Sequence, residues 1–448
     1  MAKLQPILAL LCCLLGAGTE LPVVDLAKAD WKEQALEALQ KHASFYLTNH
    51  GLGDFGRGTV GAAFQASERL FAMKELSKRA IDAGPPPKDF PVVRGYFGVG
   101  AESGTKRLRF ECKEGLSLAG SNRSKELRGN LFPQGLSSSD IDALEALPEA
   151  LKNLALRLAD GLAEVTQSRK LLSPEDAAVL AGGGDGLEAF RIFRYLPYEG
   201  TRCQGRALAG TELCWSSDHT DWGSLTLIAQ PDDGQGALEL FREGEYHRIA
   251  PLPGALLVNG GDWLELVSHG DLPSPLHRVR QPPGEDTGRT AFVYFHYPAG
   301  SAPLTPRDVV AAAERRSKAS RPPGFVFNTL TNGLEHITEA LTFKTHLQQK
   351  WLGVRATNLT AQSRSSKGAY AAYHGYRLMH VEEPYVTQAH PWMNKLIAIQ
   401  QNLEAFDWLF WVDCDLFFMN PKKTVDSLIH AALERTPEAS LLIAEDGM

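Results

Sequence analysis

The spacing of apolar residues changes along the chain, and each spacing predicts a different structure. Before residue 171, apolar positions recur every three or four residues, which predicts amphipathic helices over residues 29–42, 60–80 and 139–170. Ser139 is the expected N-cap of the last helix, and Pro148 is expected to bend this helix or split it in two. Apolar runs at 21–27 and 44–52 predict one strand on either side of the first helix.

From residue 189 onwards the period shortens to two residues. Apolar and polar residues alternate in runs at 189–195, 223–230, 237–241, 255–259 and 289–297, with Gly, Pro and Asp clusters between them. Many short alternating strands joined by turns predict a sandwich or jelly roll. A helix is expected over 305–324, with Pro306 at its first position. The fold class is therefore mixed α and β, with a jelly roll and flanking helices.

The pattern changes again after residue 365, where helical and strand-like stretches alternate as in an α/β protein. The apolar run "WLFWV" predicts a buried strand over Leu409–Val412, with Trp408, Phe410 and Trp411 as its buried side chains. Asn420 before Pro421 predicts the cap and first turn of another helix.

Composition and charge exclude several classes of protein. The chain has 448 residues, 44% of them hydrophobic and 22% charged, which suits a globular protein of two or three domains. The net charge is −7, and no basic stripe with interleaved aromatic residues indicates a nucleic-acid partner. The six cysteines are widely spread, apart from one adjacent pair near the N-terminus, and they form no CxxC motif, so they predict no disulfide framework.

The N-terminal "MAKLQPILALLCCLLGAGTE" has one lysine, an apolar run and then small residues. This order predicts a secretory signal peptide over 1–19, too short for a membrane span; a buried strand or helix is the alternative. A signal peptide favours the secretory pathway (ER or Golgi) over the cytoplasm, and only then do the glycosylation sequons at Asn122 and Asn358 matter. No later run reaches 18 apolar residues, so no membrane span is expected after the N-terminal segment.

The stretch "SDHTDWGSLTL" places His219 and Asp221 two residues apart at the mouth of a predicted strand. Alternate residues of a strand point the same way, so both side chains could reach one metal ion, or form a simple hydrogen-bonded pair. His277, at the start of a later apolar strand, is the candidate third ligand. His269 lies in a Ser-His-Gly-Asp sequence and is expected in a surface turn.

Two histidines and one carboxylate leave three positions on a metal open. Non-haem Fe(II) oxygenases use this arrangement to bind O2 and a co-substrate, although zinc could take the same ligands. Arg289, twelve residues after His277, could fork onto a co-substrate carboxylate if it points inward, or be an exposed strand arginine.

Residues 21 to about 354 resemble the isopenicillin N synthase-like 2-oxoglutarate/Fe(II) dioxygenases. The resemblance rests on ten stretches in family order: "LPVVDL", "SFYLTNHGL", "RGYFGVGAE", "FECKEGLSLAG", "NLFP", "FRIFRYLPY", "HTDWGSLTLI", "LLVNGGDWLELVSHG", "SPLHRVR" and "RTAFVYFHYP". It implies that His219, Asp221 and His277 bind Fe(II), and that Arg289 and Tyr195 bind the far carboxylate of 2-oxoglutarate. It also implies O2-dependent hydroxylation, or a related oxidation, of a small organic substrate.

One position departs from the family pattern. The family usually has Arg-x-Ser on this strand, whereas here Ala291 occupies the third position and Thr290 is expected to face the other way. A hydrogen bond to a charged group contributes about 1.5–3 kcal/mol, so 2-oxoglutarate binding is expected to be weaker. An oxidase that uses no 2-oxoglutarate stays open as an alternative.

The C-terminal part contains a second candidate site at Asp413 and Asp415, directly after the predicted strand "WLFWV". Carboxylates in this position can hold Mn2+ or Mg2+ against a nucleotide diphosphate. Together with "YAAYHGYRLMH" and "HPWMNKLIAIQ", this motif resembles the galactosyl/mannosyl/xylosyl transferases with a GT-A fold. The resemblance implies Mn2+ and a nucleotide sugar as partners. It covers only part of that family's fold, so we expect no sugar transfer.

These observations predict four regions: a signal peptide (1–19), a helical N-terminal part of the dioxygenase (20–170), a jelly-roll Fe(II)/2-oxoglutarate domain (171–354) and a partial glycosyltransferase-like segment (357–448). Two alternatives remain open. The protein could be a bifunctional enzyme, or a transferase-related protein in which the oxygenase part is an accessory binding module.

Overall fold

The computed structural model describes two units, Met1–Val354 and Arg355–Met448. The residues described are 21–83, 93–102, 109–119, 129–182, 187, 189–200, 203, 212–232, 236–284, 288–305, 341–348 and, beyond these, 367, 371, 374, 376–377, 399–400, 402, 408–410 and 424–436. The predicted signal peptide, the helix expected after Thr305, the sequons at Asn122 and Asn358, and the pair Asp413 and Asp415 lie outside the described residues.

The larger sheet of the first unit has eight strands. Their order across the sheet is β1 (Val23–Asp25), β2 (Ser44–Thr48), β12 (Leu256–Gly260), β9 (Leu225–Ala229), β14 (Arg289–His296), β6 (Ala189–Tyr195), β5 (Lys113–Ala119) and β3 (Gly95–Phe97). Only the β1–β2 pair is parallel among these neighbours. Each alternating run predicted after residue 189 forms a strand, and β6 has the predicted bounds.

The smaller sheet faces the larger one. It is antiparallel, in the order β11 (Glu245–Arg248), β10 (Leu238–Arg242), β13 (His277–Val279) and β8 (Ser216–His219). Phe193, Ile228 and Ala291 of the larger sheet share one buried cluster with Leu240 and Val279 of the smaller sheet. Two sheets closed over a common interior are a jelly roll, so the predicted fold class is confirmed.

Two further short pairs are found among the described residues of this unit: β4 (Arg109–Glu111) with β7 (Glu212–Cys214), and β15 (Pro303–Leu304) with β16 (Leu341–Thr342). Phe343 and Leu347, just after β16, are fully buried against the main core. Residues 341–348 therefore belong to the first unit.

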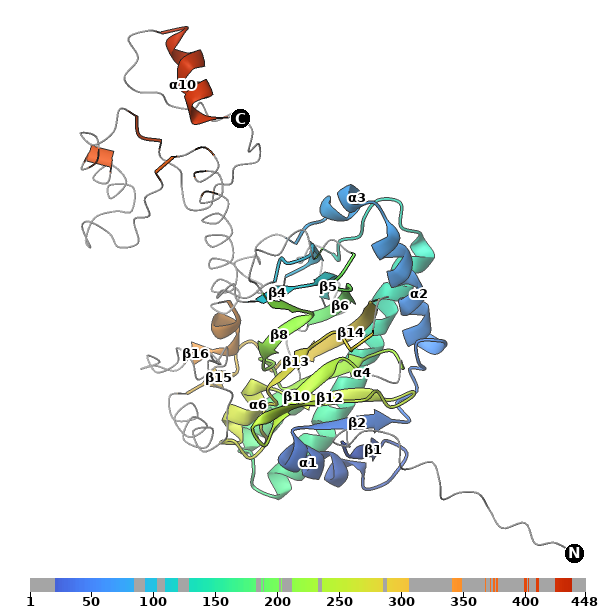
Figure 1. Cartoon of the computed structure of the whole chain (residues 1–448). Coiled ribbons are helices and arrows are strands. Elements are labelled where there is room, and N and C mark those ends of the chain that lie inside the picture. The colour runs from blue at the N-terminus through green and yellow to red at the C-terminus, as the bar shows by residue number, and fades with distance from the viewer. Residues whose placement is uncertain are drawn as a thin grey trace, which may run out of the picture. The chain divides into compact units, whose positions relative to one another are not determined.

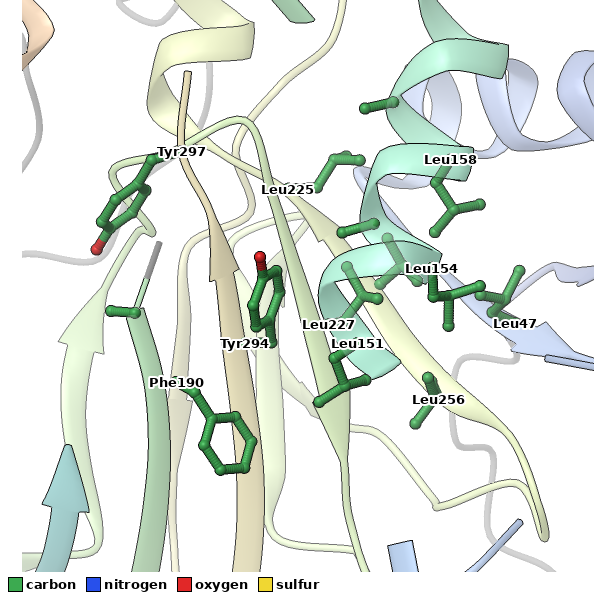
Figure 2. Close-up of a cluster of buried hydrophobic side chains, with 14 of the residues drawn as sticks. Leu47, Leu151, Leu154, Leu158, Phe190, Leu225, Leu227, Leu256, Tyr294 and Tyr297 are labelled. Atoms are coloured by element: carbon green, nitrogen blue, oxygen red, sulfur yellow. The ribbon is translucent and has the colours of Figure 1, made fainter. Parts of the chain in front are cut away.

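Helices cover the opposite face of the larger sheet (Figure 1). They are α1 (Trp31–His42), α2 (Gly58–Ala72), α3 (Glu75–Arg79), α4 (Ser138–Ser168) and α5 (Pro174–Gly182); the short α6 (Asp262–Val267) follows β12. Leucines of α4 at the helical period pack against Leu225 and Leu227 of β9 (Figure 2). Burial of each such side chain contributes about 1.5–3 kcal/mol, which anchors the sheet that carries the site.

Helix α4 corrects the predicted N-cap, which is Ser137 rather than Ser139. Of the two outcomes expected at Pro148, the split is wrong, because one helix runs through this residue. The Ser137 side chain accepts a hydrogen bond from the backbone N–H of Asp140 (3.2 Å). Leu147 and Leu151, on either side of the proline, are fully buried, so packing outweighs the local cost of an interior proline, about 3 kcal/mol.

The single helix predicted over 60–80 is two helices, because the chain becomes extended at Met73. Beyond this break Lys78 is only 2% exposed. Its ammonium donates to the Phe71 carbonyl (3.1 Å) and to Glu114 (2.8 Å). The local apolar period could not reveal this pairing, because Glu114 comes from β5.

In the second unit the described helix α10 (Val425–Leu433) is capped by Thr424, whose side chain accepts from the Ser427 N–H (3.0 Å). Trp408 and Phe410 are 37% and 55% exposed and lie in no strand, so their predicted burial is wrong. An apolar run forms a buried strand only beside other strands, and no sheet among the described residues extends past Thr342. None of the helices described has the length and apolar character to cross a membrane.

Candidate metal centre

The structure brings His219, Asp221 and His277 together at one end of the smaller sheet. His219 is the last residue of β8, and it faces His277, the first residue of β13, in register. Each histidine Nε2 lies 3.9 Å from an Asp221 carboxylate oxygen. One ligand atom from each residue can be chosen such that all three lie within 4.8 Å of one another. Three such atoms can reach a single ion.

Hydrogen bonds orient both imidazole rings toward this point. Nδ1 of His219 lies 2.7 Å from the Ser217 carbonyl oxygen, and Nδ1 of His277 lies 3.0 Å from that of Pro275. A carbonyl only accepts, so each Nδ1 carries the proton and each Nε2 keeps its lone pair for a metal. Withdrawal from water, reinforced by the neighbouring His277, lowers the pKa of His219 to about 4, so this ring is neutral at pH 7.

The donor set fits a cation. Asp221 is 4% exposed, and its Oδ2 has no hydrogen-bond partner among the described residues. A buried carboxylate oxygen without a donor is costly unless a positive charge compensates it. Two imidazole nitrogens and one carboxylate supply the nitrogen and oxygen ligands that Fe(II) takes in three-ligand sites.

The loop that carries Asp221 is fixed by the start of α6. The Asp262 N–H donates to the Asp221 carbonyl (2.7 Å), and the Thr220 hydroxyl donates to the Asp262 carboxylate (3.0 Å). Gly261 is required here, because a Cβ at that position would lie 2.2 Å from the Gly223 carbonyl oxygen. The "GGDW" sequence therefore sets the position of a ligand some 40 residues earlier in the chain.

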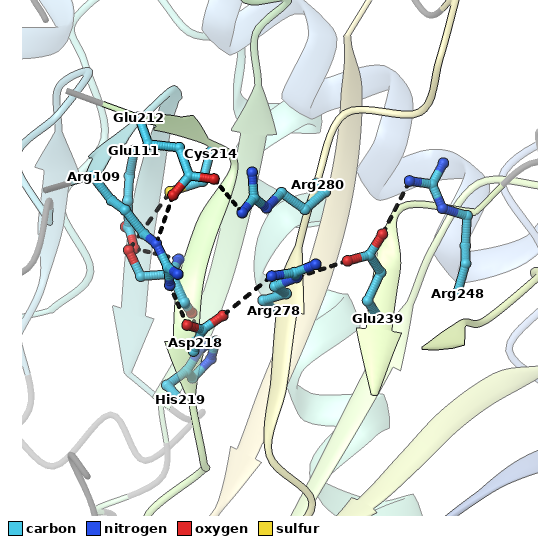
Figure 3. Close-up of polar contacts among 11 residues, drawn as sticks. Arg109, Glu111, Glu212, Cys214, Asp218, His219, Glu239, Arg248, Arg278 and Arg280 are labelled. Carbon is cyan, nitrogen blue, oxygen red and sulfur yellow. Dashed lines mark hydrogen bonds and ion pairs between the residues drawn. The ribbon is translucent and has the colours of Figure 1, made fainter. Parts of the chain in front are cut away.

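Charged side chains beside the ligands form a ladder that joins the strands of the smaller sheet (Figure 3). Asp218, next to His219, pairs with Arg109 and lies 3.9 Å from Arg278. Arg278, next to His277, pairs with Glu239 of β10 (2.7 Å), which also binds Arg248 of β11 (3.0 Å). Adjacent strand residues face opposite ways, so the ladder holds β8 and β13 from the side away from the metal ligands. No local sequence pattern indicates these pairs, because their members come from different strands.

Asp218→Asn is expected to lower the free energy of unfolding by about 1.5–3 kcal/mol, because it removes a 7% exposed carboxylate that pairs with Arg109 and lies 3.9 Å from Arg278. Among the described residues, the two arginines then keep only Glu212 and Glu239 as carboxylate partners. Urea denaturation monitored by circular dichroism measures this change. The matched control is Glu245→Gln, whose 75% exposed carboxylate pairs with His247, and it should change stability by less than about 0.5 kcal/mol. Equal stability of the two variants would contradict a stabilising role for the ladder.

Arg289 and Tyr195 lie side by side on the interior face of the larger sheet. They are register partners in the β14–β6 pair, and both are buried. Nη2 of Arg289 lies 3.4 Å from the Gln230 side-chain oxygen. Burial raises the pKa of Tyr195 to about 12, so its hydroxyl keeps its proton and can donate a hydrogen bond.

The residues after Arg289 alternate as expected. Ala291 is 5% exposed and faces the interior cluster. Thr290 faces the helices, where its hydroxyl accepts from Arg194 (3.1 Å) and donates to Glu68 (2.9 Å). The interior therefore has no hydroxyl at position 291, and Thr290 does not replace it.

Comparison with known proteins agrees with this geometry. Residues 194–298 match the 2OG-Fe(II) oxygenase superfamily, and residues 21–134 match the family described as non-haem dioxygenase in morphine synthesis N-terminal. Residues 341–438 match the galactosyl transferase GMA12/MNN10 family. The chain thus contains segments similar to the two parts of 2OG-Fe(II) oxygenases, followed by a transferase-like segment, and both resemblances found in the sequence are confirmed.

Individual relatives share parts of the chain. A 1-aminocyclopropane-1-carboxylate oxidase 1 of Doritaenopsis sp. is 31% identical over 41% of this chain and 53% of its own length. Gibberellin 2-beta-dioxygenase 2 of Oryza sativa subsp. japonica is 25% identical over 68% of this chain and 82% of its own length. The chain thus spans about half the length of the first of these curated relatives. Among solved structures, a 2OG-Fe(II) oxygenase family protein from Caulobacter crescentus has the same fold, with a TM-score of 0.52 at 20% identity over 75% of this chain and 99% of that protein.

Proposed function

We propose that the first unit is an Fe(II)- and 2-oxoglutarate-dependent oxidoreductase that acts on a small organic substrate with O2. The observation that supports it most directly is the cluster of His219, Asp221 and His277. Each Nε2 lies 3.9 Å from an oxygen of the buried Asp221 carboxylate, and Oδ2 of this carboxylate has no hydrogen-bond partner among the described residues. Its position on a jelly roll that matches the 2OG-Fe(II) oxygenases supports the same assignment.

In this proposal the three residues hold iron through two Nε2 atoms and one carboxylate oxygen and leave three positions open. Bound Fe(II), with 2-oxoglutarate and O2, supplies the chemistry that hydroxylates or otherwise oxidises the substrate, with succinate and CO2 as co-products. Arg289 forks onto the far carboxylate of 2-oxoglutarate, and the Tyr195 hydroxyl donates to the same carboxylate. The surrounding apolar side chains exclude water and strengthen these contacts.

A second candidate is an oxidase that does not consume 2-oxoglutarate. The observation in its favour is Ala291, which removes one hydroxyl from the interior face beside Arg289. Stoichiometry separates the two functions, since only the first forms succinate in proportion to the O2 consumed.

An anaerobic titration tests the proposal directly. Fe(II) and 2-oxoglutarate together are expected to produce a weak visible charge-transfer band that neither gives alone. If the purified protein binds no iron and shows no band, the first unit is a binding module without oxidative chemistry.

For the second unit we propose a partial transferase-like segment in which Asp413 and Asp415 bind Mn2+ weakly. With Mn2+ and UDP-galactose or GDP-mannose, the full chain is expected to release no nucleoside diphosphate above a protein-free control. Release that is lost in Asp415→Ala would contradict this expectation and make the protein bifunctional. Sugar transfer without any iron binding would instead favour a transferase-related protein with an accessory oxygenase fold.

A further inference from the structure

A second group of charges lies against the interior face of the larger sheet; two of its members belong to this sheet, one to β4 and one to a turn. We call Lys113, Arg191, Glu102 and Glu111 the inner ion cluster. Arg191 binds Glu102 at 2.6 Å. The Lys113 ammonium lies 2.9 Å from Glu111 and 3.4 Å from Glu102. The sequence analysis did not identify this group, although the alternation of "KEGLSLA" places Lys113 on the interior side.

Strand register places the inner ion cluster in the same interior as Arg289. Lys113 is the partner of Tyr195, which is in turn the partner of Arg289, so the three residues form one row across β5, β6 and β14. Arg191 lies on the same face, four residues from Tyr195 along β6.

The cluster also reaches the strand that carries a proposed metal ligand. The Lys113 ammonium lies 3.2 Å from the Ser216 hydroxyl on β8, which ends at His219. Burial raises the pKa of Tyr297, and Arg191 and Asp221 act on this hydroxyl in opposite directions. Both charges therefore lie within electrostatic reach of Tyr297.

Aromatic rings lie beside both cations of the cluster, Arg191 and Lys113. The Arg191 guanidinium lies 5.4 Å from the centre of the Phe97 ring and 5.8 Å from that of Phe193. The Lys113 ammonium lies 4.8 Å from the centre of the Phe193 ring. Cations beside aromatic faces suit a ligand with an anionic end and an apolar body.

The two carboxylates of the cluster differ. Glu111 is 5% exposed, and it also accepts the backbone N–H of Ser217 (2.7 Å), which makes it part of the fixed framework. Glu102 comes from the turn after β3, and its side chain is 20% exposed. Among the described residues, its carboxylate pairs with Arg191 and Lys113.

A buried ion network is a weak source of stability. Desolvation of the charges roughly cancels their attraction, and apolar residues of similar size often give a more stable protein. Such a network beside a proposed catalytic centre is better explained by recognition, since its cations come from rigid strands and its most accessible carboxylate comes from a turn.

We propose that Glu102 occupies the place of a substrate carboxylate, and that the substrate is a small organic acid with an apolar body. On binding, the acid exchanges with Glu102 between Arg191 and Lys113 and packs its apolar part against Phe97 and Phe193. This inference rests on the proposed function, because it assigns the substrate class of the same site.

Isothermal titration calorimetry on the full chain tests the exchange. The probes are phenylacetate and 3-phenylpropionate, with phenylacetamide as the uncharged analogue. We expect Glu102→Gln to bind both acids about tenfold more tightly than the unaltered protein, because it removes the competing carboxylate, and to leave phenylacetamide binding unchanged. Arg191→Met is expected to weaken acid binding at least thirtyfold.

Substitutions of charged residues outside the inner ion cluster show whether the acids bind at the cluster. Glu68→Gln removes a carboxylate that pairs with Arg194 on the opposite face of β6 (2.6 Å), and it should leave acid binding unchanged. Arg289→Leu should also retain acid binding, whereas its loss would place the probes in the 2-oxoglutarate position and overturn the inference. Thermal melting of every variant identifies those that fail to fold.

The decisive result is that for Glu102→Gln. If this folded variant binds neither acid, or binds acids no more tightly than the unaltered protein, the cluster is structural and the inference is wrong. Iron content measured on the same preparations keeps the two proposals separate. His277→Ala should lose iron and still bind phenylacetate, so a failure of either proposal is seen independently of the other.

Discussion

His277→Ala protein is expected to purify without iron and with its fold intact. Loss of one of three ligands leaves two, and removal of even a hydrogen-bond partner of a ligand lowers metal affinity roughly 10–100-fold. We therefore expect iron affinity to fall by more than about 100-fold. Strand β13 should persist, because it pairs with β10 and β8 and is joined to both through Arg278. Iron content by mass spectrometry and the melting temperature measure the two effects.

The matched control is His269→Ala. His269 lies eight residues earlier, in the exposed turn after α6, where its backbone has a φ of 49°. This variant should retain iron at the level of the unaltered protein. Equimolar iron in His277→Ala would refute the assignment of the ligands.

Arg289→Leu is expected to raise the Kd for 2-oxoglutarate about 100-fold. Removal of one partner from a buried, hydrogen-bonded charge pair costs about 2–5 kcal/mol, and each 1.4 kcal/mol corresponds to a factor of ten. Titration of the Fe(II) protein with 2-oxoglutarate, followed at the charge-transfer band, measures the change. Arg194→Leu is the control, because Arg194 lies on the neighbouring strand and faces the helices. Unchanged 2-oxoglutarate turnover in Arg289→Leu would favour the oxidase.

Ala291→Ser tests the binding of the same 2-oxoglutarate carboxylate by adding a hydrogen-bond donor instead of removing one. A serine hydroxyl beside Arg289 would restore a hydrogen bond to a charged group, worth about 1.5–3 kcal/mol, so 2-oxoglutarate should bind about tenfold more tightly. Unchanged affinity would mean that another group already fills this role, and Gln230, 3.4 Å from Arg289, is the nearest candidate.

The grouping of His219, Asp221 and His277 follows in part from strand periodicity, which the sequence shows. Residues two apart share a face, which predicted that His219 and Asp221 project together and that Ala291, but not Thr290, faces inward. His277 could be proposed because the metal needs a third ligand. That β8 and β13 lie next to each other could not be predicted from the sequence of either strand.

Features that depend on distant partners could not be predicted in the same way. Lys78 is buried because it pairs with Glu114, which comes from β5, and the helical pattern of residues 60–80 does not reveal this partner. The inner ion cluster joins residues of β4, β5 and β6 with Glu102 of a turn, and no local pattern links them. Trp408 and Phe410 were predicted to be buried and are exposed. Their apolar run has the local pattern of a strand, but it has no neighbouring strands among the described residues.

The pairing of β8 with β13 has a consequence for how the protein acquires its metal. His219 and His277 face each other across this pair, although 58 positions separate them in the chain (277 − 219). Neither strand alone holds both histidines, so a growing or refolding chain has no complete set of ligands until the smaller sheet closes. Long-range strand pairing is slow compared with local helix formation. The rate at which a refolding chain captures iron therefore measures the closure of the jelly roll itself.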